Sequence, residues 1–361
     1  MLIERHDGSE RGGVKEGYLR YSRMKILFIV GCILALMLLS IFTIGLGDTN
    51  LSYGEIIRLL IFPDGSWDAT VVWDLRFRMI VAAILAGAAL GIAGAVMQSI
   101  LRNPLASPFT LGLSNASAFG AAMAILFFNG GAVIGSTSAS VNVSSPVLVT
   151  ICAFVFAMLA TGIMLLLVRI TGCTPETIVL AGTALSSIFS AGLAFLQYIA
   201  EDNALSAIVY WQFGSLSKVS WGQLQIIAAV LIVIGAYFIF KRWDYNSLES
   251  GEDVARGLGV NIRRTRFVGL VMSAILTAIV VSFMGVIGFI GLIGPHMVKR
   301  VIGNDNRYVM PASMAVGALV LLLAYVIGTY AMPSVIPVGI ITSAIGGPLF
   351  IWILIRGRRK A

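Results

Sequence analysis

The sequence predicts an all-α, polytopic membrane protein with ten transmembrane helices. Its 361 residues are 58% hydrophobic and 12% charged, and the mean hydropathy is +0.94, which is far too apolar for a water-soluble domain. The apolar residues gather in runs of about 20, the length that an α-helix needs to cross a hydrocarbon core of about 30 Å. The charged residues gather between these runs.

Six spans are read directly from single apolar runs. The first apolar run, at about 24–46, is too long for the core of a cleaved signal peptide, so we count it as a transmembrane span that stays in the protein. The six runs cover about residues 24–46, 79–101, 109–129, 146–169, 177–199 and 219–240.

Two longer apolar blocks are divided by the distribution of basic residues. Cytoplasmic loops collect Lys and Arg, and an even number of spans must separate two cytoplasmic segments. Basic residues mark cytoplasmic segments at 241–266, at 299–307 and at the C-terminal end. The blocks therefore split near Gly285 and around Met332 and Pro333, which gives the last four spans: 266–284, 286–302, 309–331 and 335–355.

This topology places both termini in the cytoplasm. The parts are a tail at 1–23, a permease domain at 24–355 with a long loop at 241–266, and a tail at 356–361. Of the 25 basic residues, 21 fall on the cytoplasmic side. The net charge of +8 therefore reflects orientation in a cell membrane (plasma or inner) and contact with lipid, and it gives no indication of nucleic acid.

The apolar runs lack the ionisable relay that an ion-driven carrier usually keeps at membrane depth. No phosphate loop of the form G-x-x-x-x-G-K-[ST] occurs in the chain either, so ATP would be bound by another polypeptide. We expect no catalytic residue, no metal site and no cofactor on this chain, which is not an enzyme. The alternatives are a secondary transporter driven by an ion gradient and a structural or assembly protein of the membrane.

Glycines at close spacing inside the spans predict tight helix packing, because small residues let helix backbones approach in lipid. There is also a weak internal echo: Gly91, Gly94 and Arg102 recur 197 residues later as Gly288, Gly291 and Lys299. Duplicated halves are common in transporters.

The loop at 241–266 predicts a short helix. Ser250 or Gly251 can cap it, Glu252 and Asp253 favour its first turn, and glycines end it. We expect Val254, Ala255 and Leu258 to share one face. Such a helix either lies on the membrane interface or fits a cleft on a soluble motor.

Two short proline turns occur at the cytoplasmic ends of central spans, at 102–108 and at 171–177. Proline prevents a continuous helix there and gives a stiff turn. These turns are either simple connections or parts of a gate.

Five segments resemble the permease subunits of ABC importers for iron siderophores, haem and cobalamin, a FecCD-type, cobalamin-permease-like family. The likeness runs in order from about residue 73 to the end of the chain. The segments are GAALGIAGAVMQSILRNPLASPFTLGLSNASAFGA (87–121), VYWQFGSLSKVSW (209–221), LESGEDVARGLGV (248–260), GVIGFIGLIGPHMVKRVIGNDNRYVMP (285–311) and IPVGIITSAIGGPLFIWIL (336–354).

The resemblance implies a ten-span permease that pairs as a dimer, most simply a homodimer. Two cytoplasmic ATPase subunits carry ATP-Mg, and an extracytoplasmic binding protein delivers the ligand. It assigns the following residues: ATPase coupling to Gly251, Glu252, Asp253, Ala255, Arg256, Leu258 and Gly259; the cytoplasmic gate to Asn103, Leu105, Thr174, Pro175 and Glu176; and the pathway lining to Thr183, Ser186, Ser187, Ser190 and Gln197.

The extracytoplasmic arginines depart from the family pattern. The family usually has Arg-Leu-Pro-Arg before the second span, whereas this chain has Arg76, Phe77, Arg78 and Met79. Because arginine forms strong paired bonds with carboxylates, we expect Arg76 and Arg78 to dock the binding protein. The alternative is that they anchor the span at the lipid headgroups.

Overall fold

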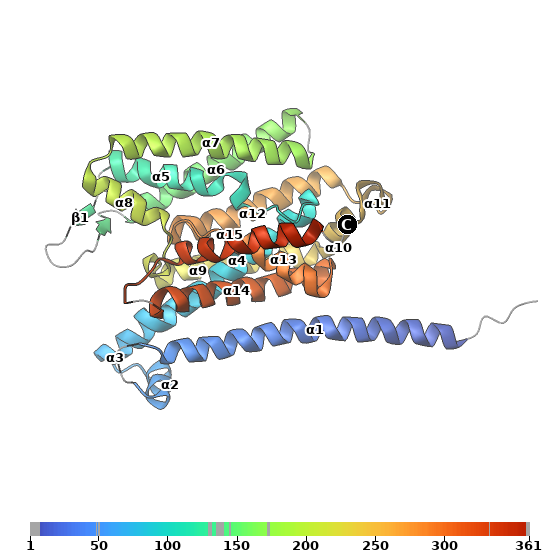
Figure 1. Cartoon of the computed structure of the whole chain (residues 1–361), viewed down its shortest axis with the longest axis horizontal. Helices are drawn as coiled ribbons and strands as arrows, with labels where there is room; N and C mark the ends of the chain where they lie inside the picture. The colour runs from blue at the N-terminus through green and yellow to red at the C-terminus, as the bar shows by residue number, and fades with distance from the viewer. Residues whose placement is uncertain are drawn as a thin grey trace, which may run out of the picture.

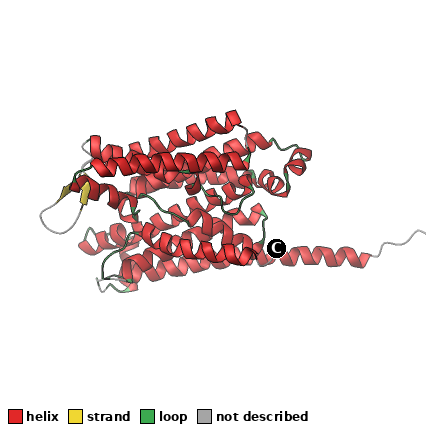
Figure 2. Ribbon diagram, turned by 45° about the horizontal axis from the view of Figure 1, so that its top comes forward, coloured by secondary structure: helices red, strands yellow, loops and turns green. Residues whose placement is uncertain are grey.

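The computed structural model describes residues 8–47, 49, 51–128, 132–134, 141–143, 146–171, 174–331 and 333–358. Long helices run roughly side by side and form one bundle, and the termini of most of them lie at its two ends (Figure 1). In Figure 2 the described chain is almost entirely helical, apart from one short antiparallel hairpin at one end of the bundle. The prediction of an all-α membrane protein is confirmed.

The described residues contain a helix at each of the ten predicted spans. Seven of these helices are long and apolar enough to cross a membrane, and two shorter apolar helices lie at Leu113–Phe127 and Val338–Ile351. The ten helices are α1(Gly8–Gly45), α4(Arg78–Leu101), α5(Leu113–Phe127), α6(Pro146–Thr171), α7(Pro175–Ile199), α9(Trp221–Phe240), α12(Ile262–Met284), α13(Ile290–Ile302), α14(Asn306–Tyr330) and α15(Val338–Arg358).

The ends of several helices are fixed by side chains that the sequence places just before them. Ser220 accepts a hydrogen bond from the backbone N–H of Gln223, and the Gln223 side chain in turn accepts one from the Ser220 N–H, so α9 begins with a capping box. Thr174 caps α7 and Asn261 caps α12 in the same general way. These caps satisfy backbone N–H groups that a helix cannot satisfy itself.

Shorter elements cover the two ends of the bundle. One end carries a β-hairpin formed by β1(Ala132–Ile134) and β2(Val141–Val143), and the other carries two short helices of the loop at 241–266, which is called the coupling loop below. The end with the hairpin also carries α2(Tyr53–Ile61), α3(Trp67–Thr70), the π-helical turn η1(Val71–Phe77), α8(Asp202–Gln212) and the 3-10 turn η3(Leu216–Lys218). The opposite end carries α10(Arg242–Ser250) and α11(Glu252–Gly257).

Helix α4 is the centre of the bundle, and its glycines allow the closest helix contacts. A Cβ atom on Gly87 would lie 2.4 Å from the carbonyl oxygen of Gly317, and one on Gly94 would lie 1.7 Å from that of Gly291. Both distances are shorter than any van der Waals contact, so only glycine permits the observed packing of α4 against α13 and α14. Gly94 and Gly291 are also the two positions that the internal echo pairs.

The polypeptide is not helical between α12 and α13. Gly285 has φ +80° and Phe289 has φ +66°, and a Cβ on Gly285 would lie 2.3 Å from the carbonyl oxygen of Trp211. Irregular backbone within a membrane bundle is tolerated where protein covers it, and Gly339 of α15 packs against the carbonyl oxygens of Phe213 and Val286. As a result α13 has only 13 residues.

Several predicted boundaries were wrong. Helix α1 begins at Gly8, so most of the predicted tail at 1–23 is helical, and α1 extends well past the bundle (Figure 1). The span predicted at 79–101 is the second part of one long helical segment, Trp67–Leu101. The predicted spans 109–129 and 286–302 begin with a 3-10 turn, η2(Phe109–Leu111), and with irregular backbone. Asn129, the predicted turn residue Met332 and the last three residues of the tail at 356–361 lie outside the described residues.

Candidate functional site: coupling loop, gates and pathway

The coupling loop folds as two short helices joined at a glycine. Gly251 has φ +131° and ends α10 directly before α11, and Gly259 has φ +78° after α11. Both conformations are rarely adopted by residues with a side chain. The predicted short helix after Gly251 is therefore present, whereas α10 was not predicted.

The exposed apolar surface of α11 is narrower than the sequence suggested. Leu258 is 68% exposed and Val254 is also exposed, but Ala255 is fully buried against the bundle. The predicted shared face of Val254, Ala255 and Leu258 is therefore wrong for Ala255. A partner that docks on α11 would meet Val254 and Leu258.

Arg266 connects α11 to the central helix α4. Its Nη2 donates to Oε1 of Glu252 at 2.8 Å, and its Nε donates to the backbone oxygen of Ile100 at 3.1 Å. Arg266 is 3% exposed and the Glu252 side chain is 35% exposed, so this ion pair is partly shielded from water and stronger than a fully exposed pair. Ile100 lies two residues before Arg102, so α11 is connected, through Arg266 of α12, to the helix that leads into the predicted gate.

The carboxylate of Glu252 forms its hydrogen bonds with arginines of the same chain. Besides Arg266, it accepts a hydrogen bond from Arg256 at 3.2 Å, and Arg256 also reaches Asp253 at 3.4 Å. Arg256 and Asp253 are exposed, and exposed pairs of this kind contribute only about 0–1 kcal/mol each. Among the predicted coupling residues, Glu252 and Ala255 hold α11 in place, and Asp253, Arg256 and Leu258 face outward.

A second polar cluster joins α10 to three spanning helices. Oε1 of Glu249 accepts hydrogen bonds from Nζ of Lys299 at 2.6 Å and from Oγ of Ser99 at 2.7 Å. Asn246 of α10 also accepts a bond from the backbone N–H of Asn306 at 2.7 Å. No local signal in the sequence indicates this cluster, because Glu249 and Lys299 are 50 residues apart.

The first predicted gate segment follows a left-handed residue at the end of α4. Arg102 has φ +47°, and the side-chain oxygen of Asn103 accepts a bond from the backbone N–H of Leu105 at 2.9 Å. Leu105 lines a very small cavity with His296 of α13 and Phe350 of α15. The segment is therefore a rigid turn wedged beside two other helices.

The second predicted gate segment is the start of α7. Thr174 accepts a bond from the backbone N–H of Thr177 at 3.3 Å, and Pro175 occupies the first turn of the helix. Glu176 lies in that first turn, where a negative charge is favoured by the helix dipole.

Helix α7 leaves one face without a neighbour in the described chain. The predicted pathway residues Thr183, Ser187 and Ser190 lie on this exposed face, together with the bulky and largely accessible Tyr198. Ser187 and Thr183 donate their hydroxyl hydrogens to carbonyl oxygens of α7 itself. The hydroxyl donors of Thr183 and Ser187 are therefore satisfied within α7 itself.

Two predicted pathway residues lie to the side of this face. The backbone and hydroxyl oxygens of Ser186 accept bonds from the Asn115 side chain at 3.3 and 2.7 Å, so Ser186 joins α7 to α5. Gln197 is half-buried. Asn115 was missed by the sequence analysis.

An aromatic pair lies beside the middle of α7 and was also missed. Phe109 is 39% exposed, and its ring lies 6.3 Å from the ring of Phe289. Gly112, at the end of the same turn, packs against Gly182 and Ser186 of α7. The ring of Phe289 covers Gly346 of α15 so closely that a Cβ there would lie 2.4 Å from it.

The two arginines expected to dock a binding protein are largely used within the chain. Arg76 is 5% exposed and donates to the backbone oxygens of Ile44 and Thr49 and to the Thr49 hydroxyl. The half-buried Arg78 donates from Nε to the backbone oxygen of Asp74 at 3.0 Å. Arg76 therefore fastens the loop after α1 to the long central helix, and this geometry leaves it no surface to offer to a partner.

The FecCD transport family matches residues 32–356 of this sequence. The chain belongs to the FecCD transport family. It is 43% identical over 344 residues to a putative ABC transporter permease protein, MJ0087, of Methanocaldococcus jannaschii, an alignment that covers 95% of this chain and 98% of the relative. It is 33% identical over 345 residues to the Fe(3+)-citrate import system permease protein YfmE of Bacillus subtilis, covering 94% and 98% of the two chains.

A solved structure supports the same fold for this FecCD permease. It is described as an inward-facing conformation of a putative metal-chelate type ABC transporter. The two structures superpose with a TM-score of 0.77 at 28% identity, and the match covers 91% of this chain and 99% of the other. The ABC importer permease fold that the sequence resemblance implied is confirmed, and the chain is a multi-pass membrane protein that acts in transport.

Proposed function

We propose that two copies of this FecCD permease form a homodimer that imports a metal chelate, such as an iron siderophore, haem or a cobalamin-type corrinoid. The Bacillus subtilis relative is named a Fe(3+)-citrate import system permease protein, and the solved neighbour is a putative metal-chelate type ABC transporter; both names support this class of cargo. The pathway runs between the exposed faces of α7 from the two copies, lined by Thr183, Ser187 and Ser190.

The observation that carries the mechanism is the bonded connection from Glu252 through Arg266 to the backbone of Ile100. Two cytoplasmic ATPase subunits, which bind ATP-Mg, dock on α11 through Val254 and Leu258. When they close and separate, they move α11, and Arg266 transfers this displacement to the end of α4. The gate residues Asn103 and Leu105 follow directly, while Thr174, Pro175 and Glu176 form the other side of the gate.

In this arrangement the coupling loop and both termini lie in the cytoplasm. An extracytoplasmic binding protein delivers the chelate at the opposite end of the bundle. Since Arg76 is buried, docking there relies on other exposed residues and on the half-buried Arg78. The chain itself supplies positioning and a path, and it makes no covalent bond with the cargo.

Reconstitution into liposomes tests the function against its alternatives. We expect the permease with its ATPase and binding-protein partners to accumulate a ferric chelate when ATP is supplied without an ion gradient. Accumulation driven by a pH or sodium gradient alone would instead support a secondary transporter. A structural protein of the membrane would give no flux under either condition.

Replacing Leu258 with aspartate is expected to weaken ATPase docking by about tenfold or more, since it puts a charge at the centre of an apolar contact. Co-purification of the ATPase subunits and ATP-driven uptake both measure this loss. Ile61→Asp makes the same change at an exposed apolar residue of α2, at the other end of the bundle. Ile61→Asp should leave ATPase binding unchanged, and Leu258→Met should retain it; equal binding by Leu258→Asp and the wild type would contradict docking on α11.

A further inference from the structure

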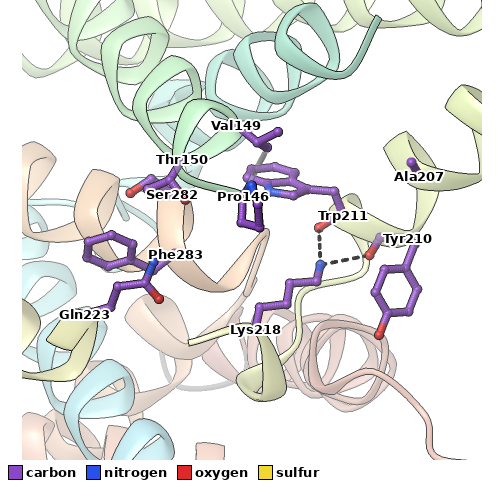
Figure 3. Close-up of a pocket in the computed structure, with 10 residues that line it drawn as sticks. All are labelled: Pro146, Val149, Thr150, Ala207, Tyr210, Trp211, Lys218, Gln223, Ser282 and Phe283. Carbon is purple, nitrogen blue, oxygen red and sulfur yellow. Dashed lines mark hydrogen bonds between the residues drawn. The ribbon is translucent and has the colours of Figure 1, made fainter. Parts of the chain in front are cut away.

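A cavity of about 240 Å³ is lined in part by α8 (Figure 3), which lies at the end of the bundle opposite α10 and α11 (Figure 1). It is smaller than the pockets of about 300–1,000 Å³ that enclose a whole drug-sized ligand. Its walls come from the first turns of α6 and α9, the end of α8, the turn η3 and the end of α12. The lining residues are Pro146, Val149, Thr150, Ala207, Tyr210, Trp211, Lys218, Gln223, Ser282 and Phe283.

Lys218 brings an amino group without a carboxylate partner to this cavity. Its Nζ donates to the backbone oxygens of Tyr210 at 3.1 Å and Trp211 at 3.3 Å, as Figure 3 shows, and it lies 4.8 Å from the centre of the Tyr210 ring. No Asp or Glu lines the cavity, and within the described chain Lys218 forms no ion pair. Desolvation lowers the pKa of Lys218 to about 7, whereas the two carbonyl groups favour its charged form.

Two further donors face the same space without partners. The Gln223 side chain uses Oε1 to accept a bond from the Ser220 N–H at 2.9 Å. Its Nε2 and the hydroxyl of Thr150 form no hydrogen bond to any other described residue, and both residues line the cavity. A space with one cation, two free donors and no carboxylate is suited to an anion that carries several acceptor oxygens.

An apolar face of α12 continues from the cavity. Phe283 lines the cavity, and Val268, Met272, Ile275 and Ile279, which precede it on the same helical face, are apolar and partly exposed. Helix α12 also packs against α6 and α9, which contribute to the cavity. At a rise of about 1.5 Å per residue, the face extends for about 22 Å, which exceeds the depth of one leaflet, about 15 Å.

We propose that the cavity binds the headgroup of one anionic phospholipid from the leaflet opposite the coupling loop. The lipid phosphate meets Lys218, the polar groups of the headgroup reach Gln223 and Thr150, and an acyl chain lies along this apolar face of α12. Trp211 and Trp221, near this level of the bundle, are residue types that favour the membrane interface. The site is separate from the exposed face of α7, so it does not depend on the cargo or on the proposed function.

The test compares lipids retained by the purified full-length protein in nanodiscs of mixed phosphatidylglycerol and phosphatidylcholine, counted by native mass spectrometry. We expect the wild type to prefer phosphatidylglycerol by about fivefold at this site, the effect of about one Lys near a membrane surface. Lys218→Met should abolish the preference, and Lys218→Arg should keep it. Arg58→Met, which removes an exposed cation of α2 outside the cavity, is the matched control and should keep it as well.

Three results would overturn the proposal. The first is an unchanged preference in Lys218→Met. The second is displacement of the bound lipid by inorganic phosphate at equal potency to intact phosphatidylglycerol, which would make the cavity a site for a free anion. The third concerns Thr150→Val, a variant that can be used if Lys218→Met does not fold, because it keeps the side-chain shape and removes one donor. Thr150→Val should reduce lipid retention about three- to fivefold. Retention at the wild-type level by Thr150→Val would refute a headgroup contact.

Discussion

Gly94→Ala is expected to lower the apparent stability of the purified protein by about 3 kcal/mol or more, among the largest effects of any single methyl group. The new Cβ would lie 1.7 Å from the carbonyl oxygen of Gly291 and 2.5 Å from its carbonyl carbon. Neither is the flexible end of a side chain, so α4 and α13 must separate and lose their close contact. Thermal unfolding of the detergent-purified protein measures the loss.

Gly162→Ala is the matched control for this experiment. Gly162 is an exposed residue inside α6, and no heavy atom lies within 4 Å of the position that its Cβ would occupy. Alanine favours a helix over glycine by up to about 1 kcal/mol, so this variant should unfold at the same temperature as the wild type or higher. Equal unfolding temperatures for the two variants would show that the α4–α13 contact does not limit stability.

Lys299→Met should destabilise the protein by about 3–5 kcal/mol, because it leaves a mostly buried carboxylate without its cation. Lys299 and Glu249 are bonded at 2.6 Å, and their side chains are only 14% and 13% exposed. The loss should also disturb α10, since Glu249 ties this coupling-loop helix to α13 and, through Ser99, to α4. Thermal unfolding and ATP-driven uptake provide the two readouts.

The double variant Glu249→Gln/Lys299→Met separates loss of the pair from loss of packing. It removes both charges, so it should recover more than half of the stability lost in Lys299→Met. Arg256→Met removes the exposed ion pairs of Arg256 with Glu252 and Asp253 in the same loop, and it should cost much less than Lys299→Met. A double variant as unstable as Lys299→Met would mean that the unpaired charge is not the cause.

The sequence was sufficient to locate the ten long helices and the short helix α11, because each depends on local signals. Apolar runs of about 20 residues located six of the ten helices, basic residues divided the two longer apolar blocks into the other four, and glycine and acidic residues around Glu252 located α11. The close contact of Gly94 with Gly291 was not predicted, although the internal echo pairs these two positions. The spans and the coupling helix depend on composition and spacing within one segment, which a single sequence contains.

The features that were missed depend on contacts between distant segments. Arg76 was expected at the surface, but the loop after α1 folds back over it and supplies carbonyl acceptors from Ile44 and Thr49. The pairing of Glu249 with Lys299 and the stacking of Phe109 near Phe289 likewise join residues that carry no mutual signal. A turn was predicted near Gly285, but the extent of the irregular backbone before α13 is set by the packing of 285–289 against α8 and α15.

The contrast between α4 and α7 has an evolutionary consequence. Nearly every side chain of α4 is buried against neighbouring helices, whereas α7 keeps an entire face free of contacts within the described chain. Substitutions on that face can therefore accumulate without disturbing the frame. In the proposed dimer, where this face lines the pathway, a few substitutions on α7 would adapt the permease to cargoes of new shape while the packed frame around α4 remains constant.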